Sequence, residues 1–272
     1  MQFFDKKKIF ITGGSSGIGK ALAIKLSGWG AHVYIAARGQ ERLDKALAEV
    51  KAAAKGSQTI GAVQMDIADR QAIKNVAKEV LESLGGLDIL INNAGVARPG
   101  HVQELDDDIF DEMMTINYFG TVNVTRAFLP HFVAQKSGHI CNVSSVLGMM
   151  GIFGYTAYAA SKFAVTGFSE CLRQELMPHG IDVSVVFPAD VDTPQLHGEE
   201  EFKPAETKAI SGTVKMLPPD AVASCIAEGI KANKHRIVPG FNTKFVLFWQ
   251  RHWPWLVRAM TDGDVKKALR KS

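Results

Sequence analysis

Short apolar runs rich in β-branched and aromatic residues alternate along this chain with longer segments in which apolar residues recur at helical spacing. A short run that ends in glycine, asparagine, serine or proline is typical of a buried strand, whereas apolar positions three and four residues apart predict a helix with one buried face. The expected strands are residues 8–12, 32–37, 61–65, 87–91, 138–143 and 181–187, and the expected helices include 20–29, 40–54, 70–84, 111–133 and a segment around 158–162.

Strands that alternate with helices require right-handed crossover connections, which place the strands side by side and parallel. We therefore expect an α/β fold of the Rossmann type, a doubly wound parallel β-sheet with helices on both faces. No linker rich in proline, glycine and serine divides the 272 residues, so the chain is expected to form a single domain.

Composition narrows the class of protein. Hydrophobic residues make up 46% of the chain and charged residues 22%, which are ordinary values for a folded globular protein. The net charge of +3 comes from basic residues spread along the sequence, so there is no basic stripe of the kind that binds nucleic acid. The apolar run near the N-terminus is too short for a signal peptide or a membrane span, and we therefore expect a cytoplasmic protein.

The three cysteines, Cys141, Cys171 and Cys225, lie far apart among apolar residues. An odd number at wide spacing fits neither a disulfide framework nor a zinc site. We therefore expect reduced thiols in or near the core, and we expect no metal site.

The strand at 8–12 leads directly into a glycine-rich turn, and a helix follows. A dinucleotide site requires this order, because glycines let the backbone approach a pyrophosphate and the helix offers its unpaired N–H groups. The spacing Gly-x-x-x-Gly-x-Gly departs from the Gly-x-Gly-x-x-Gly fingerprint, and a plain turn between strand and helix is the alternative. The residues expected to contact a cofactor here are Gly13, Ser15, Ser16, Gly17, Ile18 and Gly19.

The end of the second strand predicts which dinucleotide binds. An NAD site usually has an aspartate or glutamate there for the ribose 2′-hydroxyl, whereas an NADP site has an arginine for the 2′-phosphate. This chain has Ala37 and Arg38, with Arg42 one helical turn later. Because a guanidinium can bind a phosphate through two hydrogen bonds, we expect NADP(H) as the cofactor. The alternative is that Arg38 is a solvated loop residue.

Polar residues also follow the third and fourth strands. Asp66, which precedes Ile67, could hydrogen-bond an adenine amine or could cap the next helix, and the spacing favours neither alternative. After the fourth strand, Asn92 is followed by Asn93, Ala94 and Gly95. Two amides and two small residues suit a backbone that lies close against a ligand, although a simple turn would have the same composition.

A tyrosine and a lysine lie four residues apart, at Tyr158 and Lys162, in an expected helix. Such positions share one helix face, and a nearby ammonium lowers a tyrosine's pKa, as a general acid or base requires. By itself the pair could equally be a surface aromatic packed on a lysine stem. Asn117 is a poor helix former within the helix expected at 111–133, which indicates either a bond to backbone or a buried water.

These motifs together resemble the short-chain dehydrogenase/reductase family in order and spacing, over about residues 8–193. The resemblance implies that Tyr158 protonates a carbonyl oxygen, that Ser145 orients this oxygen, and that Lys162 binds the nicotinamide ribose while lowering the tyrosine's pKa. It also implies that Asn117 holds a water in a proton relay. The matching motifs are Thr12-Gly13-x-x-x-Gly17-Ile18-Gly19, Asn92-Asn93-Ala94-Gly95, Asn117, Ser145 and Tyr158-x-x-x-Lys162.

The resemblance also separates neighbouring candidates. The family's spacing to the tyrosine selects Ser145 rather than Ser144 as the orienting hydroxyl. Tyr155 has Ala159, not a lysine, four residues later, and it is therefore expected to line the substrate site, together with Ser145 and Tyr158.

One segment departs from the family pattern. Pro-Gly commonly follows the sixth strand, whereas this chain has Pro188-Ala189. Pro188, Val191 and Thr193 still match the segment that contacts the nicotinamide carboxamide in the family. The Cβ of Ala189, however, changes which backbone conformations the loop can adopt.

Within the family there is a narrower resemblance to 3-ketodihydrosphingosine reductases, carried by the Ala37-Arg38 strand end, the run from Asp190 to Pro194 and the segments 202–207 and 210–211. It implies NADPH-dependent reduction of a long-chain lipid ketone, 3-ketodihydrosphingosine, to dihydrosphingosine. The alternatives are a dehydrogenase of a hydroxysteroid, retinoid, 3-oxoacyl compound or other secondary alcohol, and a non-catalytic NADP(H)-binding protein.

Residues 241–260 combine phenylalanines and tryptophans with Lys244, Arg251 and Arg258. Such a mixture suits a segment at a membrane interface, while Pro254 and the charges argue against a membrane span. Packing on the subunit core or a dimer contact is the alternative. We assign residues 1–240 to a catalytic domain with a substrate loop at about 189–218, and residues 241–272 to a C-terminal extension. The family resemblance implies a homo-oligomer, a dimer or tetramer.

Overall fold

A seven-stranded parallel sheet forms the centre of the molecule in the computed structural model, which describes residues 2–211 and 216–270. The strand order is β3-β2-β1-β4-β5-β6-β7, so the predicted doubly wound α/β fold is confirmed. The strands are β1 (Lys8–Thr12), β2 (His32–Ala37), β3 (Ile60–Gln64), β4 (Ile89–Asn92), β5 (Gly138–Val143), β6 (Ile181–Val186) and β7 (Arg236–Ile237).

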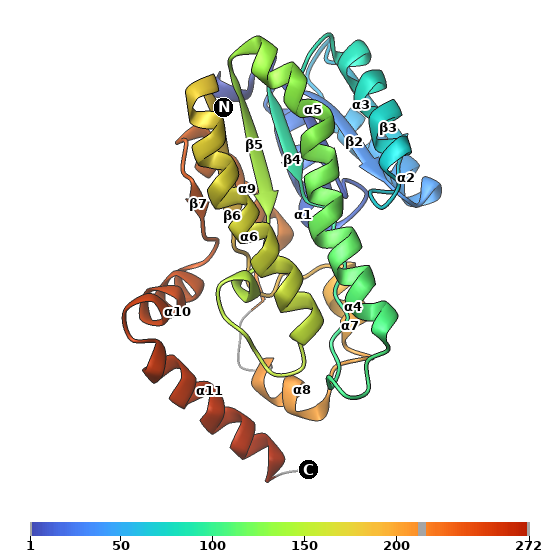
Figure 1. Ribbon diagram of the computed structural model, residues 1–272. Helices are drawn as coiled ribbons and strands as arrows, with labels where there is room; N and C mark the ends of the chain where they lie inside the picture. The colour runs from blue at the N-terminus through green and yellow to red at the C-terminus, as the bar shows by residue number, and fades with distance from the viewer. Residues whose placement is uncertain (1, 212–215, 271–272) are drawn as a thin grey trace.

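Helices cover both faces of the sheet, as Figure 1 shows. One face carries α1 (Gly17–Gly28), α2 (Gln40–Ala53) and α9 (Pro219–Lys231), and the other carries α3 (Arg70–Leu84), α5 (Thr121–Gln135) and α6 (Thr156–Leu176).

Successive side chains of a strand point to opposite faces of the sheet, so one strand contributes to the hydrophobic core on both faces. Ile9 and Ile11 of β1 face the α1 layer, while Phe10 between them faces the α5 layer, where its ring lies 5.2 Å from that of Phe128. All four side chains are fully buried. Because truncation of a buried phenylalanine to alanine typically costs about 3–5 kcal/mol, these two rings anchor β1, and with it the turn that follows.

The strand order reverses between β1 and β4. Both strands end at the same edge of the sheet, and the chain leaves them toward opposite sides. In doubly wound folds ligands bind outside the carboxyl ends of the strands at this point.

The helix expected at 111–133 is not continuous. The structure has α4 (Asp107–Met113), then a π-helical segment at Met114–Gly120, then α5. Asn117, in the π-helical segment, is fully buried, and its side chain binds the backbone of a neighbouring loop. A local widening of the helix suits a side chain that must point inward at a fixed place.

The segment expected as a substrate loop at about 189–218 contains two short helices, α7 (Pro194–Glu199) and α8 (Ala205–Ser211). Thr193 caps α7, since its Oγ1 accepts a hydrogen bond from Leu196 N at 3.3 Å. Residues 212–215 of the segment lie outside the described residues. Figure 1 shows α7 and α8 beyond the carboxyl ends of the strands.

The C-terminal extension forms two helices, α10 (Phe241–His252) and α11 (Pro254–Leu269). Leu247 of α10 is buried against Val185 and Phe187, at the end of β6. Helix α11 lies against α8. The extension therefore touches both the core and the segment after β6, as the packing alternative expected, and most of its aromatic side chains are exposed.

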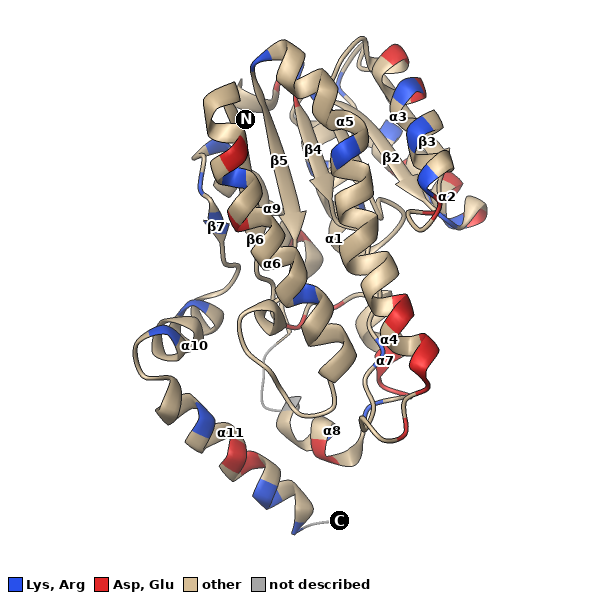
Figure 2. Cartoon of the chain, in the orientation of Figure 1, with Lys and Arg blue, Asp and Glu red and all other residues tan. Residues whose placement is uncertain are grey.

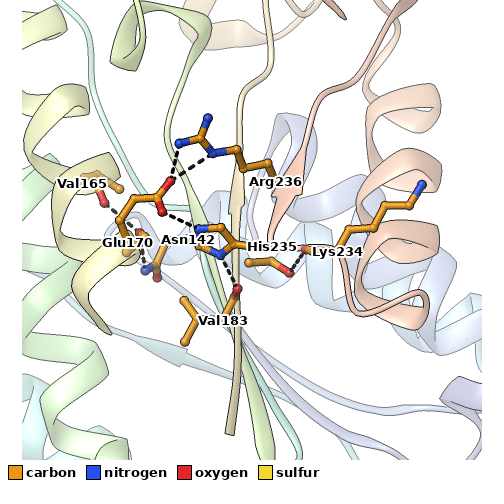
Figure 3. Close-up of polar contacts among 9 residues, drawn as sticks. Asn142, Val165, Glu170, Val183, Lys234, His235 and Arg236 are labelled. Carbon is orange, nitrogen blue, oxygen red and sulfur yellow. Dashed lines mark hydrogen bonds and ion pairs between the residues drawn. The ribbon is translucent and has the colours of Figure 1, made fainter. Parts of the chain in front are cut away.

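The short edge strand β7 was not predicted, because two residues carry no periodicity. Figure 3 shows what holds it. Arg236 donates to Glu170 of α6 from Nε at 3.0 Å and from Nη2 at 2.6 Å, and His235 Nε2 lies 3.1 Å from the same carboxylate. His235 Nδ1 donates to the Val183 carbonyl at 2.8 Å. Burial raises the pKa of Glu170, but the hydrogen bonds from Arg236 and His235 outweigh burial and lower it.

The expectation that all three cysteines lie in or near the core is wrong for one of them. Cys141 is buried in β5, where burial raises its pKa to about 12, and Cys225 is partly buried. Cys171 is exposed on α6, because the apolar sequence around it belongs to the other faces of that helix.

Candidate active site

The carboxyl edge of the sheet gathers side chains from four separate elements. Tyr158 and Lys162 come from the first turns of α6, Ser145 follows β5, Asn117 lies in the π-helical segment, and Gly95 follows β4. A Cβ on Gly95 would lie 2.9 Å from Asn117 Oδ1 and 3.2 Å from Lys162 Nζ, so these residues meet at one point. The structure thus brings together the predicted catalytic residues.

Lys162 is a buried cation. Its side chain is 4% exposed, and its Nζ donates a hydrogen bond to the Val143 carbonyl at 3.1 Å. The Nζ lies 5.7 Å from the centre of the Tyr158 ring. Because burial disfavours the charged form, the pKa of Lys162 is lowered to about 8.

The pKa of Tyr158 does not follow the sequence expectation that Lys162 lowers it. Burial raises the pKa above its ordinary value, the Glu199 carboxylate raises it further, and a hydrogen bond with Ser145 lowers it. The Lys162 ammonium donates its hydrogen bond to the Val143 carbonyl, and it lies beside the Tyr158 ring. The negative charge of Glu199 was not foreseen. In this structure the phenol is therefore protonated and is a weaker acid than a free tyrosine.

The two serines after β5 have different partners. Ser144 Oγ donates to the Lys162 carbonyl at 2.9 Å and so fixes α6 to the sheet. Ser145 Oγ accepts from Leu147 N at 3.1 Å and also hydrogen-bonds Tyr158. The structure brings Ser145, and not Ser144, to the phenol.

Asn117 binds the backbone of the loop after β4. Its Oδ1 accepts from Val96 N at 2.8 Å, and its Nδ2 donates to the Val96 carbonyl at 2.9 Å and to Ser161 Oγ at 2.9 Å. Of the two sequence alternatives, the bond to backbone is present. The relay water implied by the family resemblance stays a prediction.

The glycine-rich turn is shaped as a cradle for a dinucleotide. Gly13 has φ +67°, and a Cβ there would lie 2.8 Å from both Asn93 Nδ2 and Ala94 Cα. Gly17, at φ +52°, begins α1, and its Cβ would lie 2.9 Å from Thr193 Cγ2. Only glycine fits this combination of backbone angle and close approach.

The start of α1 leaves backbone donors available. Ser16 precedes the helix, yet its side chain makes no capping hydrogen bond to the first turn. Ser15 and Ile18 flank this turn, and a Cβ on Gly19 would lie 2.3 Å from the Gly13 carbonyl. An uncapped helix start behind a glycine turn suits an anion such as a pyrophosphate. These residues fit a nicotinamide dinucleotide.

Asn93 and Thr12 tie the loop after β4 to the turn after β1. Asn93 Nδ2 donates to the Thr12 and Gly13 carbonyls at 3.1 and 3.2 Å, and Thr12 Oγ1 accepts from Asn93 N and Ala94 N at 3.1 Å each. As expected, the amide braces neighbouring strands while Ala94 stays close to the cradle.

The residues expected near the adenosine lie at the ends of β2 and β3. Arg38 and Arg42 are exposed. Asp66 is exposed, and its Oδ1 accepts from Ala68 N at 2.9 Å, whereas Asp69 caps α3. The helix-cap alternative for Asp66 is therefore wrong. Ile67 is buried where a Cβ on Gly120 would lie 2.7 Å from its Cδ1.

The segment after β6 lies beside the cradle. The Pro188 carbonyl accepts a hydrogen bond from Val146 N at 2.9 Å, which ties this segment to the loop that carries Ser145. Val191 is buried and pairs with Leu217 in a parallel bridge. Thr193 contacts Gly17, as described above. The Ala189 departure thus leaves the segment in contact with both parts of the site.

The sequence did not single out Glu199. This residue is 6% exposed and accepts hydrogen bonds from the Tyr155 hydroxyl at 3.1 Å and from Gln195 Nε2 at 3.2 Å. The Tyr155 ring lies 5.9 Å from the Tyr158 ring. Glu199 stands in the run Glu199-Glu200-Glu201, which is typical of a solvated surface, so no sequence signal marked it as buried.

Comparison with known proteins agrees with this geometry. The family model described as short chain dehydrogenase matches residues 7–203. The 3-dehydrosphinganine reductase of Danio rerio is 40% identical over 222 residues, which cover 81% of this chain and 67% of that protein. The 3-ketodihydrosphingosine reductase of Dictyostelium discoideum is 37% identical over 253 residues, covering 88% and 76%. A short-chain dehydrogenase/reductase of Burkholderia phymatum, solved in complex with NAD, superposes with a TM-score of 0.82 at 26% identity, covering 94% and 96%.

Proposed function

The chain belongs to the short-chain dehydrogenase family, and from this premise we propose that it is an NADPH-dependent reductase of a long-chain lipid ketone, 3-ketodihydrosphingosine. Membership makes it an oxidoreductase that uses a nicotinamide cofactor and acts on CH–OH groups. The finer proposal concerns the cofactor phosphate, the substrate and the direction of reaction.

The observation that carries the proposal is the convergence of Ser145, Tyr158 and Lys162 beside the glycine cradle. The reduced nicotinamide, when bound, supplies a hydride to the carbonyl carbon. Tyr158 donates its phenolic proton to the carbonyl oxygen, and the Ser145 hydroxyl donates a hydrogen bond that orients this oxygen. Lys162, with a pKa of about 8, is positively charged in most molecules at neutral pH and can return a proton toward the phenol after each turnover.

The preference for NADPH is supported by the end of β2. The guanidinium of Arg38 is exposed, and no carboxylate among residues 2–211 and 216–270 forms an ion pair with it. Arg42 is in the first turn of α2, and its guanidinium lies next to Gly39, the residue after Arg38. Two guanidiniums without an acidic partner suit a 2′-phosphate and would leave a 2′-hydroxyl with few contacts.

The substrate assignment is supported by the activities for which the two relatives are named and by the sequence of the segment from Asp190 to Pro194. A long-chain ketone also has an apolar tail to accommodate. Exposed apolar side chains are frequent on α10 and α11, at the end of the molecule where α8 lies.

A Tyr158→Phe variant tests the chemistry. The change removes the proton donor and keeps the ring, so we expect NADPH oxidation with 3-ketodihydrosphingosine to fall by at least about 100-fold. NADPH binding, measured by the fluorescence of the bound nucleotide, should change less than threefold. Retained turnover would overturn the role of Tyr158.

A comparison of ketones tests the substrate. The wild-type protein should oxidise NADPH faster with 3-ketodihydrosphingosine than with a short acetoacetyl thioester, and should bind NADPH more tightly than NADH. A preference for the thioester would instead support a 3-oxoacyl reductase. Equal affinities for the two nucleotides would remove Arg38 from the cofactor site.

We further propose that the protein meets a lipid surface through α10 and α11, as a peripheral membrane protein on the cytoplasmic side. Phe241, Phe245 and Phe248 are spaced along one face of α10 and are 80%, 54% and 51% exposed. Trp255, at the start of α11, is 66% exposed. Apolar side chains beside basic ones suit an interface with anionic lipid.

The charges of the extension favour the same surface. Lys244, Arg251 and Arg258 are exposed, and Figure 2 shows basic residues on both helices, together with acidic residues in the middle of α11. No helix within the described residues is both long and apolar enough to cross a bilayer.

We also propose a homo-oligomer, formed through the outer faces of α5 and α6. Phe119, in the π-helical segment just before α5, and Phe163 of α6 are 43% and 46% exposed. Light scattering of the purified protein would measure the oligomeric mass, and a monomer at all concentrations would contradict this proposal.

A further inference from the structure

We propose that the carboxylates of Glu199 and Asp190 bind an ammonium group of the substrate next to its carbonyl, so that the enzyme selects 2-amino ketones. This inference rests on the proposed function and concerns the same site. It assigns to this pair the recognition of the polar head of the substrate, whereas Ser145 and Tyr158 act on the carbonyl.

Glu199 lies near the phenol that meets the carbonyl oxygen, and the segment of Asp190 is tied to the loop of Ser145 by the hydrogen bond from Val146 N to the Pro188 carbonyl. Glu199 reaches the site through Tyr155, whose hydroxyl donates to it at 3.1 Å and whose ring lies 5.9 Å from that of Tyr158. Asp190 follows β6 in the segment that also holds Val191 against Leu217. Both carboxylates act electrostatically on Tyr158, and Asp190 also acts on Glu199.

Among the residues that the structure describes, no ion pair neutralises the negative charge at this place. Within residues 2–211 and 216–270, no lysine, arginine or histidine nitrogen lies within ion-pair distance of Glu199 or Asp190. The buried Lys203 is the cation whose charge reaches both, and it pairs with Glu200. The hydrogen-bond donors to Glu199 are the neutral groups of Tyr155 and Gln195.

Buried carboxylates are costly unless a cation or several donors compensate them. Burial raises the pKa of both Glu199 and Asp190, and each raises the pKa of Tyr158. A substrate ammonium would supply the missing charge and would favour the ionised form of both groups.

The chemistry of the ligand follows from the place of Glu199, which binds the hydroxyl of Tyr155 beside the Tyr158 ring. A cation that contacts Glu199 while the carbonyl contacts Tyr158 must lie close to that carbonyl in the same molecule. An amine on the carbon next to the ketone satisfies this condition. Its positive charge would also offset the effect of Glu199 on the phenol, so that proton donation becomes easier once the correct substrate is bound.

Two ketones of equal chain length provide the test. They are 3-ketodihydrosphingosine and 1-hydroxyoctadecan-3-one, which lacks only the amine. With the wild-type protein and NADPH, we expect the amino ketone to have a kcat/KM at least about tenfold higher, the value typical of one hydrogen bond to a charged group. Equal kcat/KM values would overturn the inference and leave the proposed reductase function intact.

Glu199→Gln and Asp190→Asn locate the effect. Glutamine keeps the hydrogen bond with Tyr155 and removes the charge, so we expect KM for the amino ketone to rise by about 10- to 100-fold while KM for the amine-free ketone changes less than threefold. The exposed neighbour supplies the matched control, Glu201→Gln, which should leave both ketones unchanged.

The remaining outcomes are distinguishable. If either variant slows both ketones equally, the carboxylate has a structural role and the inference falls. If Glu199→Gln does not fold, Asp190→Asn and the wild-type comparison still decide. If the wild-type protein reduces neither ketone, the proposed function is wrong and the inference falls with it.

Discussion

Lys162 carries its charge in surroundings that disfavour it. Its folded-state pKa of about 8 lies below the ordinary value of 10.5, because burial penalises the ammonium. Between these two values the unfolded chain holds the proton and the folded chain does not, so stability rises with pH across this window. Below about pH 8 both states are protonated, and the folded protein bears the full cost of the buried charge.

Lys162→Met should therefore make the protein more stable and inactive. Methionine keeps the length of the side chain and removes the charge, although the Val143 carbonyl loses its donor. We expect the free energy of unfolding at pH 7 to rise by about 1 kcal/mol and reduction to be lost. Urea unfolding at pH 7 and pH 10 measures this, and the gain should be smaller at pH 10. Lys78→Met on the exposed face of α3 is the control, and a destabilised Lys162→Met would contradict the account.

Single residues of the site differ in how far the sequence could predict them. Tyr158 and Lys162 could be predicted from their residue types and spacing, and the family resemblance then singled out Ser145. Glu199 could not, since its burial depends on how α7 packs against Tyr155. The direction of the pKa of Tyr158 was mispredicted because burial raises it, and the unforeseen Glu199 carboxylate raises it further.

The π-helical segment at Met114–Gly120 holds the loop after β4 in place through the side chain of Asn117. Asn117 satisfies both the N–H and the carbonyl of Val96. In Asn117→Ala the partly buried N–H and carbonyl of Val96 lose their partners, so we expect a loss of about 2 kcal/mol in stability. Turnover should also fall, because Gly95, next to Val96, lies against Lys162.

Thermal unfolding and NADPH oxidation measure the two effects of Asn117→Ala. Asn75→Ala on the exposed face of α3 is the matched control, and it should change stability by less than about 0.5 kcal/mol. A folded, fully active Asn117→Ala would show that the loop after β4 does not depend on this side chain.

Whole elements were predictable where their patterns are long. The expected strands all form, and β1, β2, β4, β5 and β6 are short apolar runs that are mostly buried, whereas the edge strand β3 is only partly buried. The π-helical segment was missed, since its sequence remains compatible with an unbroken helix and its geometry comes from the tertiary bond of Asn117. The edge strand β7 was missed because it depends on Glu170 of α6, a contact across 66 residues of sequence.

At the scale of the whole molecule, the proposed lipid surface can be tested by binding to vesicles. Phe241, Phe245 and Phe248 would enter the interface, so their joint replacement by serine should weaken binding to vesicles of phosphatidylglycerol and phosphatidylcholine by at least about tenfold. Binding of the wild-type protein should weaken as salt is added, because the exposed lysine and arginine side chains contribute.

Cosedimentation with vesicles measures this binding. The matched control is Val102→Ser, an exposed apolar residue on the loop before α4, which should bind as the wild-type protein does. Equal binding by the triple variant would leave α10 and α11 as an oligomer contact, which light scattering would detect.

Helix α11 packs against α8, so a lipid substrate held at α11 would lie next to α8. A chain of about fifteen methylenes costs roughly 12 kcal/mol to expose to water, at about 0.8 kcal/mol per methylene. Release of such a ketone from a membrane into water would therefore be strongly unfavourable. If α11 rests on the bilayer, as proposed, α8 lies next to it, and the ketone would reach the protein from the membrane. The rate of supply would depend on the mole fraction of ketone in the membrane, and hardly at all on its concentration in water.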